Sequence, residues 1–280
     1  MSKQIPFRYN FVGSFLRPAN LKAAREGFEN GKISDYELKA VEDKEIERLI
    51  NKQKELGYHV ITDGEFRRAT WHLDFMWGFD GVAHEKTKTG LPFHGEDAMI
   101  DDTYLCGKVG LSKVHPFVEH FKFVKQFEDE NTVAKQTIPA PAQFIEQMIM
   151  PFALENPSKY YDSTHKLAED IANGYKKVIA DLYDAGCRNL QLDDCSWGML
   201  VDPRAEELFG TDKKGLKNIQ ELLVEINNLA IEDKPNDMTI TNHVCRGNFH
   251  STYESAGAYD SVAEVLFDKD TVDASYIEFD

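Results

Sequence analysis

Two residues in the stretch "TITNHVCRGNF", His243 and Cys245, have side chains that can bind a metal ion. The stretch predicts a β-strand, and side chains two positions apart on a strand point the same way. Zinc accepts an imidazole nitrogen and a thiolate sulfur in one site. A packed histidine beside a buried free cysteine is the commoner role of such a pair. The pair alone leaves both interpretations open.

A third ligand would have to come from another strand, because the sequence has no H-E-x-x-H or C-x-x-C motif. Glu278 is the best candidate, since it ends the apolar stretch "ASYIEFD" and carboxylates complete many zinc sites. Asp280 competes with it, being on the same side of the strand. The alternative for Glu278 is a solvated strand end.

Pairs of acids follow two other apolar stretches, "YHVITDGE" and "RNLQLDDC". Asp63 and Glu65 share one side of the first strand, and Gln191, Asp193 and Cys195 share one side of the second. Such carboxylates act as general acids or bases, as metal ligands, or as partners of a substrate ammonium group. Capping of the following helix is the alternative for each pair.

The stretch "FVGSFLRP" places Gly13 and Ser14 directly after a candidate strand. Backbone N–H groups at such a turn can hold a carboxylate or a phosphate. Nucleotide binding has no motif support, because both G-x-G-x-x-G and the Walker lysine loop are absent. A serine hydrolase has none either, because there is no G-x-S-x-G.

Helix–glycine–strand units position these residues. Apolar side chains at helical spacing run up to Gly57 and again from Ser163 or Thr164 to Gly186, and a third helix is expected to end near Ile231. Each is followed by a short apolar stretch that ends in polar residues. Such repetition predicts parallel strands covered by helices, with the active site at the carboxyl ends of the strands.

Seven candidate strands are counted, one fewer than an eight-stranded (β/α)8 barrel needs. We therefore expect an α/β fold of the TIM-barrel type, lacking its last βα unit, as a single domain over residues 1–280. Weak periodicity around residues 80–130 predicts an irregular insertion there. The candidate strands are "NFVGSF", "YHVITDGE", "CGKVGLS", "TVAKQTIPA", "RNLQLDDC", "MTITNHVC" and "ASYIEFD".

The composition excludes several classes of protein. The 48 acidic and 32 basic residues give a net charge of −16, which disfavours nucleic acid and anionic membranes as partners. There is no apolar run of transmembrane length and no signal-peptide core near the N-terminus. Four scattered cysteines do not form a disulfide framework. A cytoplasmic protein with reduced thiols is expected.

Taken in order, these stretches resemble the catalytic barrel of the cobalamin-independent methionine synthase family, and in particular its short single-domain relatives. The likeness spans almost the whole chain. It rests on "FVGSFLRP", "VITDGEFRRATWHLDF", "LQLDDCSWGML", "NHVCRGNF", "YDSVAEVLF" and "YIEFD", of which "DGEFRRATWHLDF" and "NHVCRGNF" are the most specific.

The resemblance implies a TIM barrel that binds zinc and transfers a methyl group to a thiol. The thiol would be homocysteine, giving methionine, and the donor a methylated folate. Zinc would be held by His243, Cys245 and Glu278. The resemblance also assigns the substrate carboxylate to Gly13 and Ser14. It also implies that Glu65 and Asp193 bind the substrate ammonium group and act as the catalytic acids.

The family's fourth zinc ligand is a cysteine after the glutamate strand, and Cys106, Cys187 and Cys195 all precede His243. We therefore expect the fourth ligand to be missing from this chain. An incomplete barrel would expose a strand edge and an apolar helix face, which favours a homo-oligomer. Two alternatives stay open: a zinc-dependent hydrolase or lyase on the same barrel, and a catalytically inactive, truncated relative.

Overall fold

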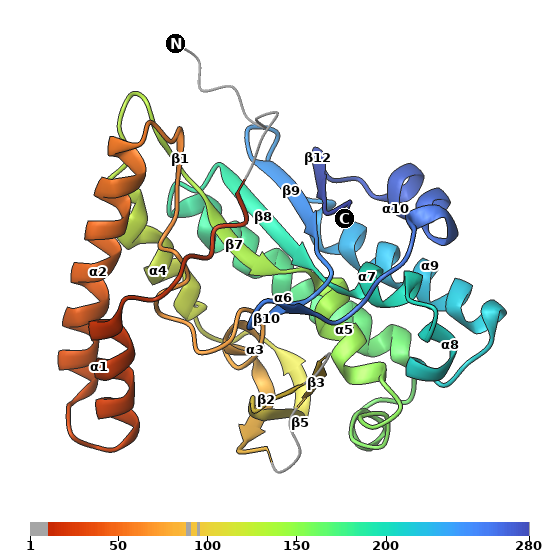
Figure 1. Cartoon of the computed structure of the whole chain (residues 1–280). Coiled ribbons are helices and arrows are strands. Elements are labelled where there is room, and N and C mark those ends of the chain that lie inside the picture. Colours follow the sequence, from red (N-terminus) through yellow and green to blue (C-terminus); the bar gives the residue numbers. More distant parts are fainter. Residues whose placement is uncertain (1–10, 88–90, 94–95, 280) are drawn as a thin grey trace.

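The computed structural model describes residues 11–87, 91–93 and 96–279. Helices and strands alternate along most of the chain (Figure 1). The helices are α1 (Ala19–Glu29), α2 (Asp35–Glu55), α3 (Leu73–Met76), α4 (Pro116–Lys125), α5 (Pro141–Ile149), α6 (Thr164–Asp184), α7 (Ser196–Val201), α8 (Ala205–Leu208), α9 (Lys213–Ile231) and α10 (Ala263–Lys269), with the 3-10 turns η1 (Pro157–Lys159) and η2 (Tyr259–Ser261). The strands are β1 (Val60–Ile61), β2 (Asp80–Glu85), β3 (Leu91–Phe93), β4 (Glu96–Ala98), β5 (Asp102–Gly110), β6 (Val133–Ala134), β7 (Gln136–Pro139), β8 (Asn189–Asp194), β9 (Thr239–Val244), β10 (Asn248–Phe249), β11 (Thr252–Tyr253) and β12 (Ala274–Ile277).

Parallel strands form the centre of the molecule. One sheet has the order β12-β9-β8-β7, and a second pairs β1 with β6. Because β6 and β7 are separated only by Lys135, the segment 133–139 joins the two sheets into one arc. Helices α5, α6 and α9 pack along the outside of this arc (Figure 1). The expected α/β class with parallel strands is confirmed.

Local sequence signals set the ends of the long helices. Ser34 caps α2 in a capping box with Glu37, and Ser163 caps α6 by accepting a hydrogen bond from the Lys166 N–H. Gly57 and Gly186 follow these two helices with φ of 80° and 91°, as the helix–glycine–strand pattern predicts. The third helix ends at Ile231, also as predicted.

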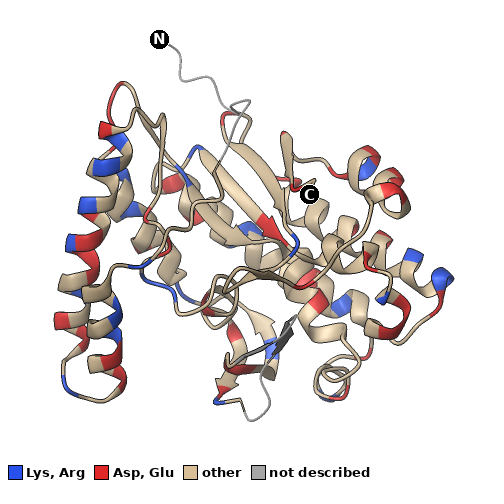
Figure 2. Cartoon of the chain, viewed as in Figure 1, with Lys and Arg blue, Asp and Glu red and all other residues tan. Residues whose placement is uncertain are grey.

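Strand β8 shows how the core presents polar groups. All six of its residues are buried, with Leu190 and Leu192 on one face and Gln191 and Asp193 on the other. The leucines belong to the apolar core cluster. Charge is concentrated on the outer helices such as α1 and α2, while the parallel strands β12, β9, β8 and β7 carry none up to the acidic end of β8 (Figure 2). A polar face at the carboxyl end of a buried strand is where parallel folds place their sites.

Two expected strands differ in the structure. In the stretch "NFVGSF", residues 11–15 form only one isolated bridge, between Ser14 and Gly64. Gly13 has φ 120°, which interrupts the extended backbone that a strand needs. The stretch "CGKVGLS" lies mostly in β5, which pairs antiparallel with β2 instead of joining the parallel arc. The alternation of side chains in this stretch fits a parallel or an antiparallel partner strand, so the local sequence does not determine which one it pairs with.

Closure of a barrel is not seen within the described ranges. There β12 pairs only with β9, and Ser14 contributes a single β-bridge, to Gly64, rather than a paired strand. In the same ranges no helix is long and apolar enough to cross a lipid bilayer. The region 80–110 holds the antiparallel pair of β2 and β5 and the short pair of β3 and β4.

Candidate active site

The residues singled out from the sequence lie at the carboxyl ends of the parallel strands. Glu65 follows β1, Asp193 is near the end of β8, and Cys245 comes directly after β9. Glu278 comes directly after β12. Four segments far apart in the chain therefore contribute to one end of the arc, where parallel α/β folds carry out their chemistry.

His243 lies between Asp193 and Glu278. Its β9 position pairs with Asp193 on one side and Tyr276 on the other, and its Nε2 lies 3.8 Å from a carboxylate oxygen of Glu278. Burial opposes protonation of this imidazole, but the hydrogen bond with Cys245 and the charge of Asp193 outweigh it and raise the pKa of His243. The structure therefore brings His243 together with Cys245, Glu278 and Asp193.

Glu278 is fixed by its own surroundings. Its N–H donates to the carbonyl of Val244 at 3.1 Å, which continues the β9–β12 ladder by one residue. Its carboxylate accepts a 3.1 Å hydrogen bond from the N–H of Arg246, and its carbonyl accepts from the Tyr259 hydroxyl at 2.9 Å. Asp280, the competing candidate, lies outside the described residues.

Cys195 lies beside Cys245, a contact that the sequence did not predict. The two residues follow the last paired positions of β8 and β9, Asp194 and Val244. Hydrogen bonds from Cys195 and His243 outweigh the effect of burial and lower the pKa of Cys245 to about 6. Because Cys195 precedes His243 in the chain, it does not match the position of the family's fourth zinc ligand. The register of two neighbouring strands nevertheless places it next to the candidate metal ligands.

Glu65 lies in a strained turn and is buried. Its φ of 60° is uncommon for a residue other than glycine, and its N–H donates to the carboxylate of Asp63 at 2.8 Å. Its own carboxylate accepts from the Thr137 hydroxyl at 2.9 Å and pairs with the Arg68 guanidinium at 3.2 Å. Strain of this kind persists where surrounding contacts hold it, and it is frequent at functional sites.

Asp193 is buried near a second acid and a lysine. Burial, followed by repulsion from Glu65, raises the pKa of Asp193 to about 7, while His243 and Lys135 oppose the rise. The amide of Gln191 donates to its carboxylate at 2.7 Å. Two carboxylates that repel each other in a buried place suit a cationic ligand, and a substrate ammonium group is one.

Gly13 and Ser14 lie at the same end of the arc. Gly13 is buried and its carbonyl accepts from the Thr62 hydroxyl at 2.8 Å, whereas Ser14 is exposed. A Cβ on Gly13 would meet the Thr137 methyl at 2.8 Å, so glycine is required for the approach to β7.

The donor atoms at the strand ends are of the kinds that bind zinc. Imidazole, thiolate and carboxylate are all zinc ligands, and His243 contacts both Cys245 and Glu278. In the part of the chain that is described, however, no three His, Cys, Asp or Glu side chains are arranged to hold a metal ion together. The donor types fit zinc, and in this structure they contact one another in pairs rather than as a preformed site of three ligands.

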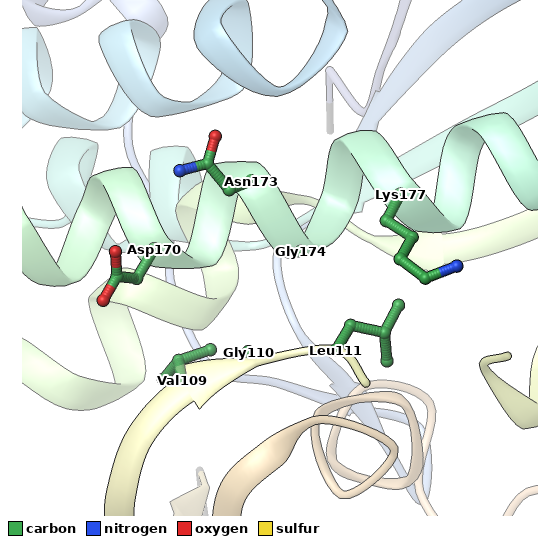
Figure 3. Close-up of a pocket in the computed structure, with 7 residues that line it drawn as sticks. All are labelled: Val109, Gly110, Leu111, Asp170, Asn173, Gly174 and Lys177. Carbon is green, nitrogen blue, oxygen red and sulfur yellow. The ribbon is translucent and has the colours of Figure 1, made fainter. Parts of the chain in front are cut away.

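Sequence reasoning also missed two deeply buried cations near the acids Glu65 and Asp193, namely Arg68 and Lys135, which are 1% and 3% exposed. For Lys135 a signal was present, because it is the one charged residue in the apolar stretch "TVAKQTIPA". A separate hollow with a volume of about 160 Å³ lies between α6 and the end of β5 (Figure 3). It shares no residue with this site and is lined by Val109, Gly110, Leu111, Asp170, Asn173, Gly174 and Lys177.

Comparison with known proteins assigns the fold. Residues 8–89 match the family model described as the cobalamin-independent synthase, catalytic domain. The uncharacterized protein YxjH of Bacillus subtilis is 36% identical over 278 residues, which are 99% of this chain and 72% of YxjH. A crystal structure from Listeria monocytogenes, assigned as a vitamin-B12-independent methionine synthase, matches with 37% identity and a TM-score of 0.75, over 98% of this chain and 73% of that one.

A more distant relative bears a functional name. The methionine synthase of Sulfurisphaera tokodaii is 28% identical over 187 residues, which are 65% of this chain and 50% of the relative. The extent of the YxjH and Listeria matches, together with the strand-end residues described above, leads to one assignment. The chain belongs to the cobalamin-independent methionine synthase family.

Proposed function

We propose that this protein is a methyltransferase that moves a methyl group to the thiol of homocysteine, with a methylated folate as the donor. The observation that carries the proposal is the placement of His243, Cys245 and Glu278 beside the acids Asp193 and Glu65, in a chain of this family. We also propose that residues 1–280 act as one domain.

In this proposal the chain binds the two ends of the amino acid at separate places. Glu65 and Asp193 hold the ammonium group, and the Gly13–Ser14 turn holds the carboxylate. Fixing both ends orients the thiol and lowers the entropic part of the barrier. His243, Cys245 and Glu278 would hold zinc, which when bound lowers the pKa of a thiol and so favours the thiolate at neutral pH.

The test is metal content together with methyl transfer. The wild-type protein, purified with added zinc, is expected to retain zinc and to methylate homocysteine from 5-methyltetrahydrofolate. His243→Ala is expected to lose both, and His165→Ala, a substitution of an exposed histidine on α6, is the matched control. Metal content that His243→Ala leaves unchanged would remove the zinc assignment. Turnover that survives the combined loss of Glu65 and Asp193 would remove their roles.

A further inference from the structure

A buried lysine connects two parts of the proposed substrate site. The ammonium of Lys135 donates to the carbonyl of Phe11 at 2.6 Å and to the side-chain oxygen of Gln191 at 2.8 Å. The carbonyl of Val12 lies 3.4 Å from it, and the Phe11 ring lies 4.9 Å away. Lys135 therefore joins the N-terminal segment 11–14 to the interior of the arc.

Gln191 continues this connection to Asp193. Its side-chain amide donates to the carbonyl of Val12 at 2.8 Å and to the carboxylate of Asp193 at 2.7 Å. Since its oxygen accepts from Lys135, both ends of the amide are used and its orientation is fixed. We call Lys135 and Gln191 the clamp.

Other contacts of the segment that the clamp holds, among the described residues, include the Thr62 hydrogen bond to Gly13 and the bridge of Ser14 to Gly64. The Phe11 ring also lies 5.0 Å from the Tyr58 ring. The segment carries the turn that would bind the substrate carboxylate, and Asp193 would bind the ammonium. The clamp therefore spans both ends of an α-amino acid.

Packing alone does not account for a lysine at this place. Burial lowers the pKa of Lys135 to about 8, against the charges of Asp193 and Glu65, so the ammonium costs free energy there. A methionine of similar length would fill the same space without that cost. A role for the charge explains why a cation stands between the acids and the segment.

We propose that Lys135 and Gln191 are positioning residues that set the spacing between the Gly13–Ser14 turn and Asp193, and so select thiols that carry an α-amino acid group. This rests on the proposed function. Neither residue takes part in the chemistry; both act through the segment and through Asp193.

The first test needs no ligand. Lys135→Met should raise the hydrogen-exchange rate of the amides in residues 13–15 by about tenfold or more, the size of one hydrogen bond to a charged group. Exchange in α9 and β9 should stay the same. Lys177→Met, which removes an exposed ion pair with Asp181 on α6, is the control and should change neither region. Unchanged exchange at residues 13–15 in Lys135→Met would overturn the clamp.

The second test compares three ligands by calorimetry: homocysteine, 4-sulfanylbutanoate without the amino group, and 3-aminopropane-1-thiol without the carboxylate. If the clamp sets the spacing, Lys135→Met should weaken the binding of homocysteine about tenfold or more. It should weaken the binding of each ligand that lacks the amino group or the carboxylate less than about threefold. Equal weakening of all three would indicate a merely structural role and overturn the proposal.

The two tests separate this inference from the proposed function. Wild-type protein that fails to bind homocysteine overturns the proposed function and with it the selection of amino acids. The exchange result then decides alone whether the clamp holds the segment.

Discussion

Cys195 donates a hydrogen bond from its thiol to the sulfur of Cys245, across the ends of two neighbouring parallel strands. The contact acts in opposite directions on the two groups. It raises the pKa of Cys195 well above its ordinary value and is the largest influence that lowers the pKa of Cys245.

The reactivity of Cys245 in metal-free protein follows from this contact. With a pKa of about 6, Cys245 is mostly thiolate at pH 7 and should react readily with iodoacetamide. Cys195→Ala removes the donated hydrogen bond, so the pKa of Cys245 should rise and its alkylation at pH 7 should slow several-fold. Mass spectrometry measures the rate, and the exposed Cys106 is the internal control. Equal rates in both proteins would contradict the assigned contact.

Glu146 makes stability depend on pH. Burial, followed by the charges of Glu254 and Asp194, raises its pKa from 4.5 to about 8. Below pH 4.5 both the folded and unfolded states hold the proton, so Glu146 costs nothing. Between pH 4.5 and 8 only the unfolded state loses the proton. The free energy of unfolding therefore falls as the pH rises, and the loss levels off above pH 8.

Glu146→Gln should therefore be no more stable than wild type at pH 4 and more stable by on the order of a few kcal/mol at pH 8.5. The hydrogen bond from Gln143 can be retained by the new amide oxygen. Urea unfolding at the two pH values measures the difference. A gain that is the same at both would show that titration of Glu146 is not its cause.

Gly13→Ala should weaken both stability and homocysteine binding. The left-handed φ of 120° costs about 1–3 kcal/mol for a residue with a Cβ, and the contact with the Thr137 methyl adds to it. Adding Thr137→Ser removes that methyl but keeps the hydroxyl, so it should recover only part of the loss. Gly31→Ala, at φ 67° with nothing within 4 Å, is the control for the backbone term alone. A loss no larger than that of Gly31→Ala would exclude the clash.

The buried pair of Arg68 and Glu65 predicts a non-additive result. Arg68→Met leaves the Glu65 carboxylate buried without its cation and should cost about 3–5 kcal/mol. Adding Glu65→Gln removes the charge and should restore much of that stability, while binding of homocysteine stays weak. Urea midpoints and calorimetry measure the two quantities. Additive losses of stability would mean that the pair does not interact.

The repeating units were predictable because each is set by local chemistry. Gly57 and Gly186 supply the positive φ that ends a helix, and the short apolar stretches after them are typical of strands buried on both faces. From these units the α/β class and the strand-end location of the candidate residues followed.

The remaining features depend on which segments meet, and local pattern does not contain that. Alternation in β5 is compatible with a parallel or an antiparallel partner, and only the fold pairs it with β2. Cys195 was set aside because it precedes His243 in the chain, yet strand register places it next to Cys245. Lys135 carried a signal as an isolated charge, but its partners at Phe11 and Gln191 could not be read from its neighbours.

The clamp also has a consequence for the order in which the protein is made. The hydrogen bond from Gln191 to Val12 joins residues 179 positions apart, and that from Lys135 to Phe11 joins residues 124 apart. At about 5–20 residues per second, the ribosome delivers Gln191 roughly 10–40 s after Val12. Helices α1 to α6 are synthesised in that interval, so the turn proposed to bind the substrate carboxylate must wait for its partners while the scaffold around it is already forming.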